Sequence, residues 1–112
     1  MKEIKAYLHR NRVADVIAAL KASPAWSAAG QVGRPNLAVY LVKGSLTPLG
    51  DDERHYSLEL GDEVVNEYKI ELVCDDNVAD ELVGAISSAA RTGQPGAGWV
   101  TVTDLVRALR IA

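Results

Sequence analysis

The sequence lacks the features that are typical of exported, membrane-inserted and nucleic-acid-binding proteins. It has a single cysteine, Cys74, so no disulfide can form within the chain, which fits a reducing compartment. No apolar run approaches the roughly eighteen residues that cross a bilayer as a helix, and alternating charges at residues 2–5 interrupt any signal-peptide pattern. The net charge of −3 argues against a general electrostatic attraction to nucleic acid. These absences predict a soluble, cytoplasmic protein.

Catalytic patterns are missing as well. The sequence contains no Ser/His/Asp set, no paired cysteine motif and no carboxylate pair with usable spacing, so we expect no enzymatic activity. At 112 residues, of which 48% are hydrophobic, the chain is expected to form one domain, residues 1–112. A domain of this size has a modest core, and association with further copies would help to stabilise it.

Hydrophobic periodicity predicts strands that alternate with helices. The expected strands are residues 2–8, 37–44, 67–74 and 98–102, and the expected helices are residues 13–22, 78–91 and a short last one, 105–109. Asn11 is a candidate N-cap of the first helix, and Asp75–Asn77 are candidate caps of the second. Residues 23–33 read as an irregular connection in which Trp26 is a packed anchor. Residues 45–60 read as a long exposed loop, with weak strand pairing at residues 56–60 before a turn at Gly61-Asp62.

The element order predicts a fold of the α+β class. Two β-α-β halves form a ferredoxin-like βαββαβ sandwich, with a four-stranded antiparallel sheet and both long helices on one face. Residues 37–42 are apolar at successive positions, so both faces of that strand are expected to be buried. Helices on one side cannot cover the second face, and the pattern therefore predicts association through the sheets.

A glycine-rich stretch joins the second helix to the last strand. Gly93, Gly96 and Gly98 leave backbone N–H groups free of Cβ atoms, so these groups can turn toward one anion, and Arg91 supplies positive charge beside them. The alternative is a plain helix stop, with Gly93 as a left-handed cap and Pro95 just beyond it. On these residues alone, both interpretations stay open.

The same stretch resembles the C-terminal signature of the P-II nitrogen-regulatory signalling proteins. The matching residues are Ala90-Arg91-Thr92-Gly93-x-x-Gly96-x-Gly98, Asp104-Leu105, Ala108-Leu109-Arg110-Ile111, Val42-Lys43-Gly44 and Lys69-Ile70-Glu71. The resemblance implies a cytoplasmic homotrimer with adenine nucleotide (ATP, ADP or AMP) in clefts between subunits. It also implies a T-loop, residues 45–60, that docks on a membrane transporter or a regulatory protein.

The resemblance also implies which residues bind the nucleotide. Phosphate would lie on Gly93, Gly96 and Gly98 with Arg91, Thr92 and Arg110, while Gly44, Glu71 and Val73 would flank the base and the sugar. Residues 23–33 are an insertion relative to the family pattern.

Departures from the family pattern bear on the ligand. Trp99 stands where the family has a phosphate-binding lysine, so a diphosphate or monophosphate is expected in place of ATP. Thr47 and Pro48 replace an arginine-glutamine pair that holds magnesium, ATP and 2-oxoglutarate, and Leu60 replaces a uridylylated tyrosine. We expect neither the usual 2-oxoglutarate sensing nor uridylylation at that position.

An alternative function is metal binding. Suitable ligand types for a divalent ion are offered by His55, Cys74 and the acidic loop before His55, as in a CutA-like trimer linked to heavy-metal efflux. A solvated acidic loop and a buried, inert cysteine are the competing interpretations.

Overall fold

The computed structural model describes residues 1–27, 35–50 and 53–112. Along the chain the elements are β1 (Lys2–His9), the 3-10 turn η1 (Arg10–Arg12), α1 (Val13–Ala22), the 3-10 turn η2 (Pro24–Ser27), β2 (Ala38–Gly44), β3 (Arg54–Ser57), β4 (Asp62–Cys74), α2 (Asp76–Ala89) and β5 (Trp99–Asp104).

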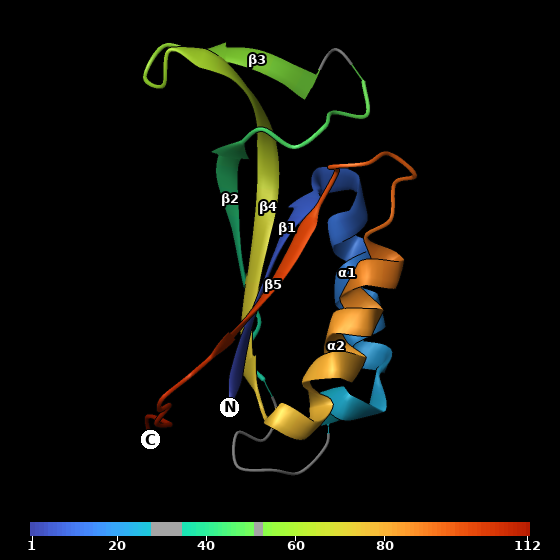
Figure 1. The fold of residues 1–112 in the computed structure, drawn as a ribbon, viewed down its shortest axis with the longest axis vertical. Helices are drawn as coiled ribbons and strands as arrows, with labels where there is room; N and C mark the ends of the chain where they lie inside the picture. Colours follow the sequence, from blue (N-terminus) through green and yellow to red (C-terminus); the bar gives the residue numbers. More distant parts are fainter. Residues whose placement is uncertain (28–34, 51–52) are drawn as a thin grey trace.

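The strands form one antiparallel sheet in the order β2-β4-β1-β5, and β3 extends it by pairing with the first part of β4. Both helices cover one face of this sheet, and the other face is open (Figure 1). This arrangement confirms the predicted α+β, ferredoxin-like fold. The predicted four strands are present, and β3 is a fifth.

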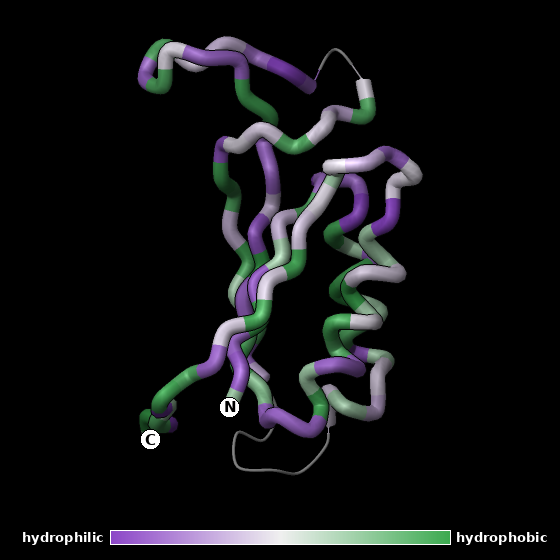
Figure 2. The backbone as a smooth tube through the Cα atoms, viewed as in Figure 1, coloured by the Kyte–Doolittle hydropathy of each residue, from purple (hydrophilic) through white to green (hydrophobic). Residues whose placement is uncertain are grey.

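The core lies between the helices and the covered face of the sheet. Ile4, Ala6 and Leu8 of β1 alternate with more polar neighbours, and all three are at most 1% exposed. Figure 2 shows hydrophobic and hydrophilic segments alternating along the strands of the sheet. Val16 and Leu20 of α1 pack into the same cluster as expected from their helical spacing. The predicted common face of residues 68, 70, 72 and 74 is also the helix-covered one, since Ile70, Leu72 and Cys74 belong to this cluster.

The T-loop contains more regular structure than the sequence predicts. Residues 54–57 form β3, and β4 begins at Asp62, five residues before the expected start. The turn between the two strands passes through Gly61, whose φ of 66° favours glycine. The β3–β4 hairpin projects beyond the end of the helices (Figure 1).

The predicted helix at 105–109 is wrong. Residues 105–112 have no regular structure. Leu105 extends the pairing of β5 with β1 by one hydrogen bond, from its N–H to the Met1 carbonyl at 3.0 Å. A five-residue helix has too few internal hydrogen bonds to form without packing. The tail makes little contact with the rest of the chain: Val106 and Ile111 are 103% and 98% exposed.

Two predictions concern the segments around α1. Trp26 is buried, at 4% exposure, and joins the core from η2, so the expected anchor is confirmed. The rest of the expected insertion, residues 28–33, lies outside the described residues. Asn11 is not the N-cap, because η1 precedes the helix and Arg12 takes that position without a side-chain cap.

Candidate functional site

The glycine loop, residues 90–98, connects α2 to β5 at the same end of the molecule as the root of the T-loop (Figure 1). Gly93 and Gly96 have φ values of 86° and 75°, in the left-handed region where a side chain is strained. The helix stops earlier than expected, since Ala90 is its C-cap, so Gly93 turns the loop and does not cap the helix. Gln94 N–H donates to Thr92 Oγ1 at 3.2 Å, and buried Ala97 holds the loop against the body.

The T-loop is hydrogen-bonded to the glycine loop through Thr47. Its N–H donates to the Gly96 carbonyl at 3.0 Å, and its hydroxyl donates to the Pro95 carbonyl, also at 3.0 Å. A Cβ at Gly96 would lie 3.1 Å from the Thr47 hydroxyl, so glycine is also needed there for close approach. Sequence reasoning places Thr47 in the T-loop but gives no sign of this contact.

Gly44 lies at the end of β2 beneath a buried carboxylate. Glu67 of β4 is 4% exposed and fills the space that a Cβ at Gly44 would take. The same carboxylate accepts the Leu46 N–H at 3.0 Å, which fixes the first turn of the T-loop. Glu67 is therefore a structural anchor that the sequence analysis missed.

Two hollows meet at the glycine loop. One is lined by Arg91, Thr92, Gly93, Gly96, Gly98 and their neighbours, and the other by Tyr7, Gly44, Glu67, Gly96 and Trp99. Gly96 and Trp99 line both hollows. The structure thus brings six of the predicted site residues to one end of the sheet: Gly44, Arg91, Thr92, Gly93, Gly96 and Gly98.

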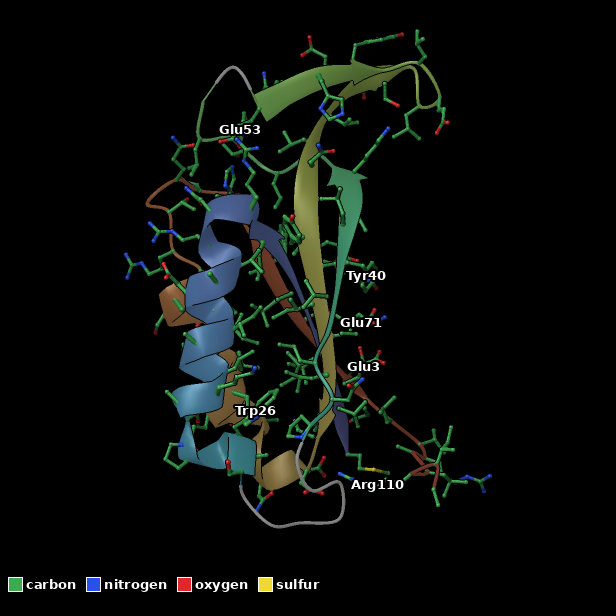
Figure 3. All side chains as sticks on the ribbon, turned by 180° about the vertical axis from the view of Figure 1, so that it is seen from behind. Glu3, Trp26, Tyr40, Glu53, Glu71 and Arg110 are labelled. Atoms are coloured by element: carbon green, nitrogen blue, oxygen red, sulfur yellow. The ribbon has the colours of Figure 1, made fainter. Side chains whose placement is uncertain are left out.

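Glu71, Val73 and Arg110 lie at the other end. They line a separate hollow with Glu3 and Ala38, and Figure 3 shows Glu71, Glu3 and Arg110 along the open face. Gly44 pairs with Val65 and Ala38 with Glu71, so the two groups are about six residues, or roughly 20 Å, apart along β4. The structure therefore does not bring all nine residues into one pocket.

Glu71 is the centre of a polar cluster on the open face. Its Oε1 accepts the Tyr40 hydroxyl at 2.5 Å and lies 3.2 Å from Lys69 Nζ. These contacts, the Tyr40 hydrogen bond first, lower the pKa of Glu71, and the Tyr40 and Glu71 hydrogen bonds raise the pKa of Lys69. Lys69 Nζ also lies 5.3 Å and 5.2 Å from the ring centres of Tyr7 and Tyr40, a cation–π arrangement.

We expect the Tyr40→Phe variant to have a higher pKa at Glu71, because the hydroxyl is the largest cause of the lowering. A carboxyl whose pKa is lowered by folding stabilises the protein above its unfolded pKa, and this stabilisation disappears as the pH falls through the folded value. The variant should therefore be less stable than the native chain at neutral pH and converge with it in acid. NMR titration of the Glu71 carboxyl carbon, with denaturation at both pH values, measures this.

Tyr56→Phe is the matched control, since Tyr56 is an exposed tyrosine on β3. The Glu71 titration should be unchanged in that variant. If Tyr40→Phe also leaves it unchanged, the hydroxyl does not hold the carboxylate.

The two candidate metal ligands are far apart. His55 lies on β3 opposite Val64, and Cys74 ends β4, ten residues or roughly 30 Å further along that strand. Within the described ranges, no group of three or more His, Cys, Asp or Glu side chains is placed to hold a metal ion. Cys74 is 1% exposed, and burial raises the pKa of its thiol, as for a core residue.

Among residues 1–27, 35–50 and 53–112, no helix is both long enough and apolar enough to cross a membrane. No profile of a known protein family matches the chain.

Individual relatives do match over nearly its full length. The chain is 32% identical over 111 residues to the nitrogen regulatory protein P-II of Nostoc punctiforme. The aligned residues cover 99% of this chain and 91% of the relative. It is 32% identical, with the same coverage, to nitrogen regulatory protein P-II 1 of Escherichia coli K12. It is 30% identical to nitrogen regulatory protein P-II 1 of Methanothermobacter thermautotrophicus, covering 99% of this chain and 89% of that one. The chain therefore belongs to the nitrogen regulatory protein P-II family of signal-transduction proteins.

Proposed function

We propose that this chain is a trimeric sensor that binds an adenine nucleotide between protomers and reports its presence to a partner protein through the T-loop. The observation that carries the proposal is the pair of hydrogen bonds from Thr47 to Pro95 and Gly96. Through them the loop that would bind phosphate and the loop that would contact a partner are one hydrogen-bonded unit. A ligand that moves the glycine loop must also move or strain the root of the T-loop.

The glycine loop suits a phosphoryl group. Left-handed Gly93 and Gly96 allow backbone N–H groups to point outward, and such concave sets of N–H groups bind anions. Arg91 is exposed beside them and can reach a phosphate oxygen. Because exposed Trp99 stands in place of a lysine, few cations remain for a long phosphate chain, and a nucleoside diphosphate or monophosphate fits better than ATP.

A second protomer would complete the site. The open face of the sheet carries a cross-strand row, Trp99, Tyr7, Lys69 and Tyr40, that the helices do not cover. Packing of this face around a common axis would bury Trp99, which is 66% exposed in one protomer. It would also allow Glu71, Val73 and Arg110 of one protomer to approach Gly44 and the glycine loop of another. This packing supplies the base and sugar contacts that a single chain lacks.

The hairpin formed by β3 and β4 presents the surface for the partner. Tyr56, Leu58 and Leu60 are 61%, 90% and 58% exposed near its tip. Apolar side chains gathered at such a tip suit insertion into an apolar cavity of another protein. We propose a membrane transporter or a regulatory protein as that partner, and a purely regulatory role without catalysis.

Calorimetric titration of the full chain with ATP, ADP and AMP tests the nucleotide site. We expect saturable binding, with ADP or AMP stronger than ATP, and one nucleotide per protomer. Arg91→Ala should weaken ADP binding about tenfold, because one charge-assisted hydrogen bond contributes about 1.5 kcal/mol or more.

Arg107→Ala is the control, since Arg107 is an exposed arginine in the tail outside the proposed site. It should leave the affinity within about twofold, the range expected of a surface change. Heats equal to those of buffer dilution for all three nucleotides would contradict the proposal.

A further inference from the structure

His9, at the end of β1, is a buried histidine with two side-chain partners. It is 2% exposed, and its Nε2 contacts the carboxylate of Glu53 in the T-loop, which is 12% exposed. Its Nδ1 lies 2.9 Å from Asn11 Oδ1 in η1. Figure 3 labels Glu53 where the T-loop passes the amino-terminal end of α1. The contact joins residues 44 positions apart in the sequence.

Both ring nitrogens of His9 face oxygen atoms that accept hydrogen bonds. A neutral imidazole carries one N–H donor and one acceptor nitrogen, so it can satisfy only one of these oxygens. An imidazolium donates from both nitrogens and also pairs its charge with the Glu53 carboxylate. The contacts therefore fit the charged ring.

The other charged groups near His9 come from three elements. Glu67 of β4 is opposite His9 in the strand register and is itself buried, but its carboxylate accepts the Leu46 N–H. Arg10 and Arg12 flank it from η1, and Arg12 lies 3.6 Å from Asp15. The Glu53 carboxylate is thus the acid in contact with the imidazole, and Arg12 is paired with an acid of α1.

The T-loop is attached to the rest of the chain at both of its ends. Glu67 binds Leu46 at its start, Thr47 binds the glycine loop, and His9 binds Glu53 just before β3. Glu53 N–H also closes a turn onto the Gly50 carbonyl at 3.1 Å. Of these attachments, only the His9 contact involves an imidazole, the type of side chain that proteins use as a switch near neutral pH.

We propose that the His9 imidazolium latches the T-loop to β1 through Glu53, and that loss of one ring proton releases this end of the loop. The neutral ring would leave one nitrogen lone pair against an oxygen and a buried carboxylate without its cation. The T-loop and its hairpin then move more freely in alkaline than in acidic solution. The latch goes beyond the proposed function, because neither nucleotide nor partner takes part in it.

NMR relaxation of the full chain without nucleotide tests the latch. Heteronuclear NOE values of the residue 53–57 amides are compared at about pH 5.5 and about pH 8.5, on either side of the usual histidine range. We expect rigid amides at the lower pH, loss of NOE intensity at the higher pH, and a midpoint that coincides with the charge change of the His9 ring nitrogens. Amides that stay rigid while His9 loses its proton would overturn the proposal.

Three variants separate the latch from a general loss of packing. Glu53→Gln keeps the shape of the side chain but removes its charge, so its 53–57 amides should be mobile at both pH values. Asn11→Asp offers only oxygen acceptors to Nδ1 and should keep the loop rigid to a higher pH. His55→Gln changes the other histidine of the chain and should respond as the native chain does. A response lost in His55→Gln, or unchanged in Glu53→Gln, would overturn the latch.

Discussion

The Leu82→Ala variant is expected to unfold with a free energy about 2–5 kcal/mol lower than that of the native chain. Leu82 lies in the middle of α2, is 0% exposed and belongs to the core cluster between the helices and the sheet. Truncation removes apolar contacts and leaves a cavity that close-packed neighbours only partly fill. Domains of this size have a total stability of about 5–15 kcal/mol, so the loss is a large share. Urea denaturation followed by circular dichroism measures it.

Leu58→Ala is the control for that experiment. The chemical change is the same, but Leu58 is 90% exposed near the tip of the β3–β4 hairpin, so we expect a change within about 0.5 kcal/mol. Both variants are compared at one protein concentration, because association shifts the apparent stability of an oligomer. Equal losses in the two variants would mean that Leu82 is not in a packed core.

The sequence predicts the elements in which buried apolar residues recur at a regular spacing. The bounds of α1, Val13–Ala22, follow from apolar spacing on one face, and β1 follows from strict alternation in residues 2–8. The sequence does not predict the first residues of β4, since Asp62 and Glu63 are polar and exposed. Their strand structure comes from backbone pairing with β3, which leaves no hydrophobic pattern in the sequence.

The candidate site also has parts that the sequence predicts and parts that it does not. The glycine loop is visible in the sequence because left-handed backbone requires glycine, as the φ angles of Gly93 and Gly96 bear out. The anchors of the T-loop are not visible, because Glu67 and His9 meet partners 21 and 44 positions away. From the sequence alone, Glu67 is expected at the surface, because charged side chains are mostly exposed. Its burial follows from the fold, which places Leu46 and Gly44 beside it. Which residues of a second protomer would complete the proposed cleft also depends on packing between chains, which leaves no local pattern in the sequence.

The Gly44→Ala variant is expected to be less stable than the native chain by about 1–3 kcal/mol, the cost of a lost hydrogen bond to a buried group. The new methyl would overlap the Glu67 carboxylate, which must then leave its position and release the Leu46 N–H. Leu46 is 6% exposed, so its N–H would lack water as a substitute. Gly84→Ala is the control: outside the backbone of α2 itself and the two neighbouring residues, no atom lies within 4 Å of an added Cβ there. That variant should gain about 0.5–1 kcal/mol in helix propensity.

A double-mutant cycle with Glu67→Ala distinguishes this collision from simple backbone strain. Glu67→Ala by itself removes the acceptor of the Leu46 N–H and should cost a similar amount. Once the carboxylate is gone, the methyl of Ala at position 44 has nothing to displace, so the second change should cost little. The two losses should therefore be far from additive, with a coupling energy of about 1 kcal/mol or more, as for residues in direct contact. Additive losses would show that Gly44 is needed for its backbone alone, and that Glu67 anchors the T-loop independently of it.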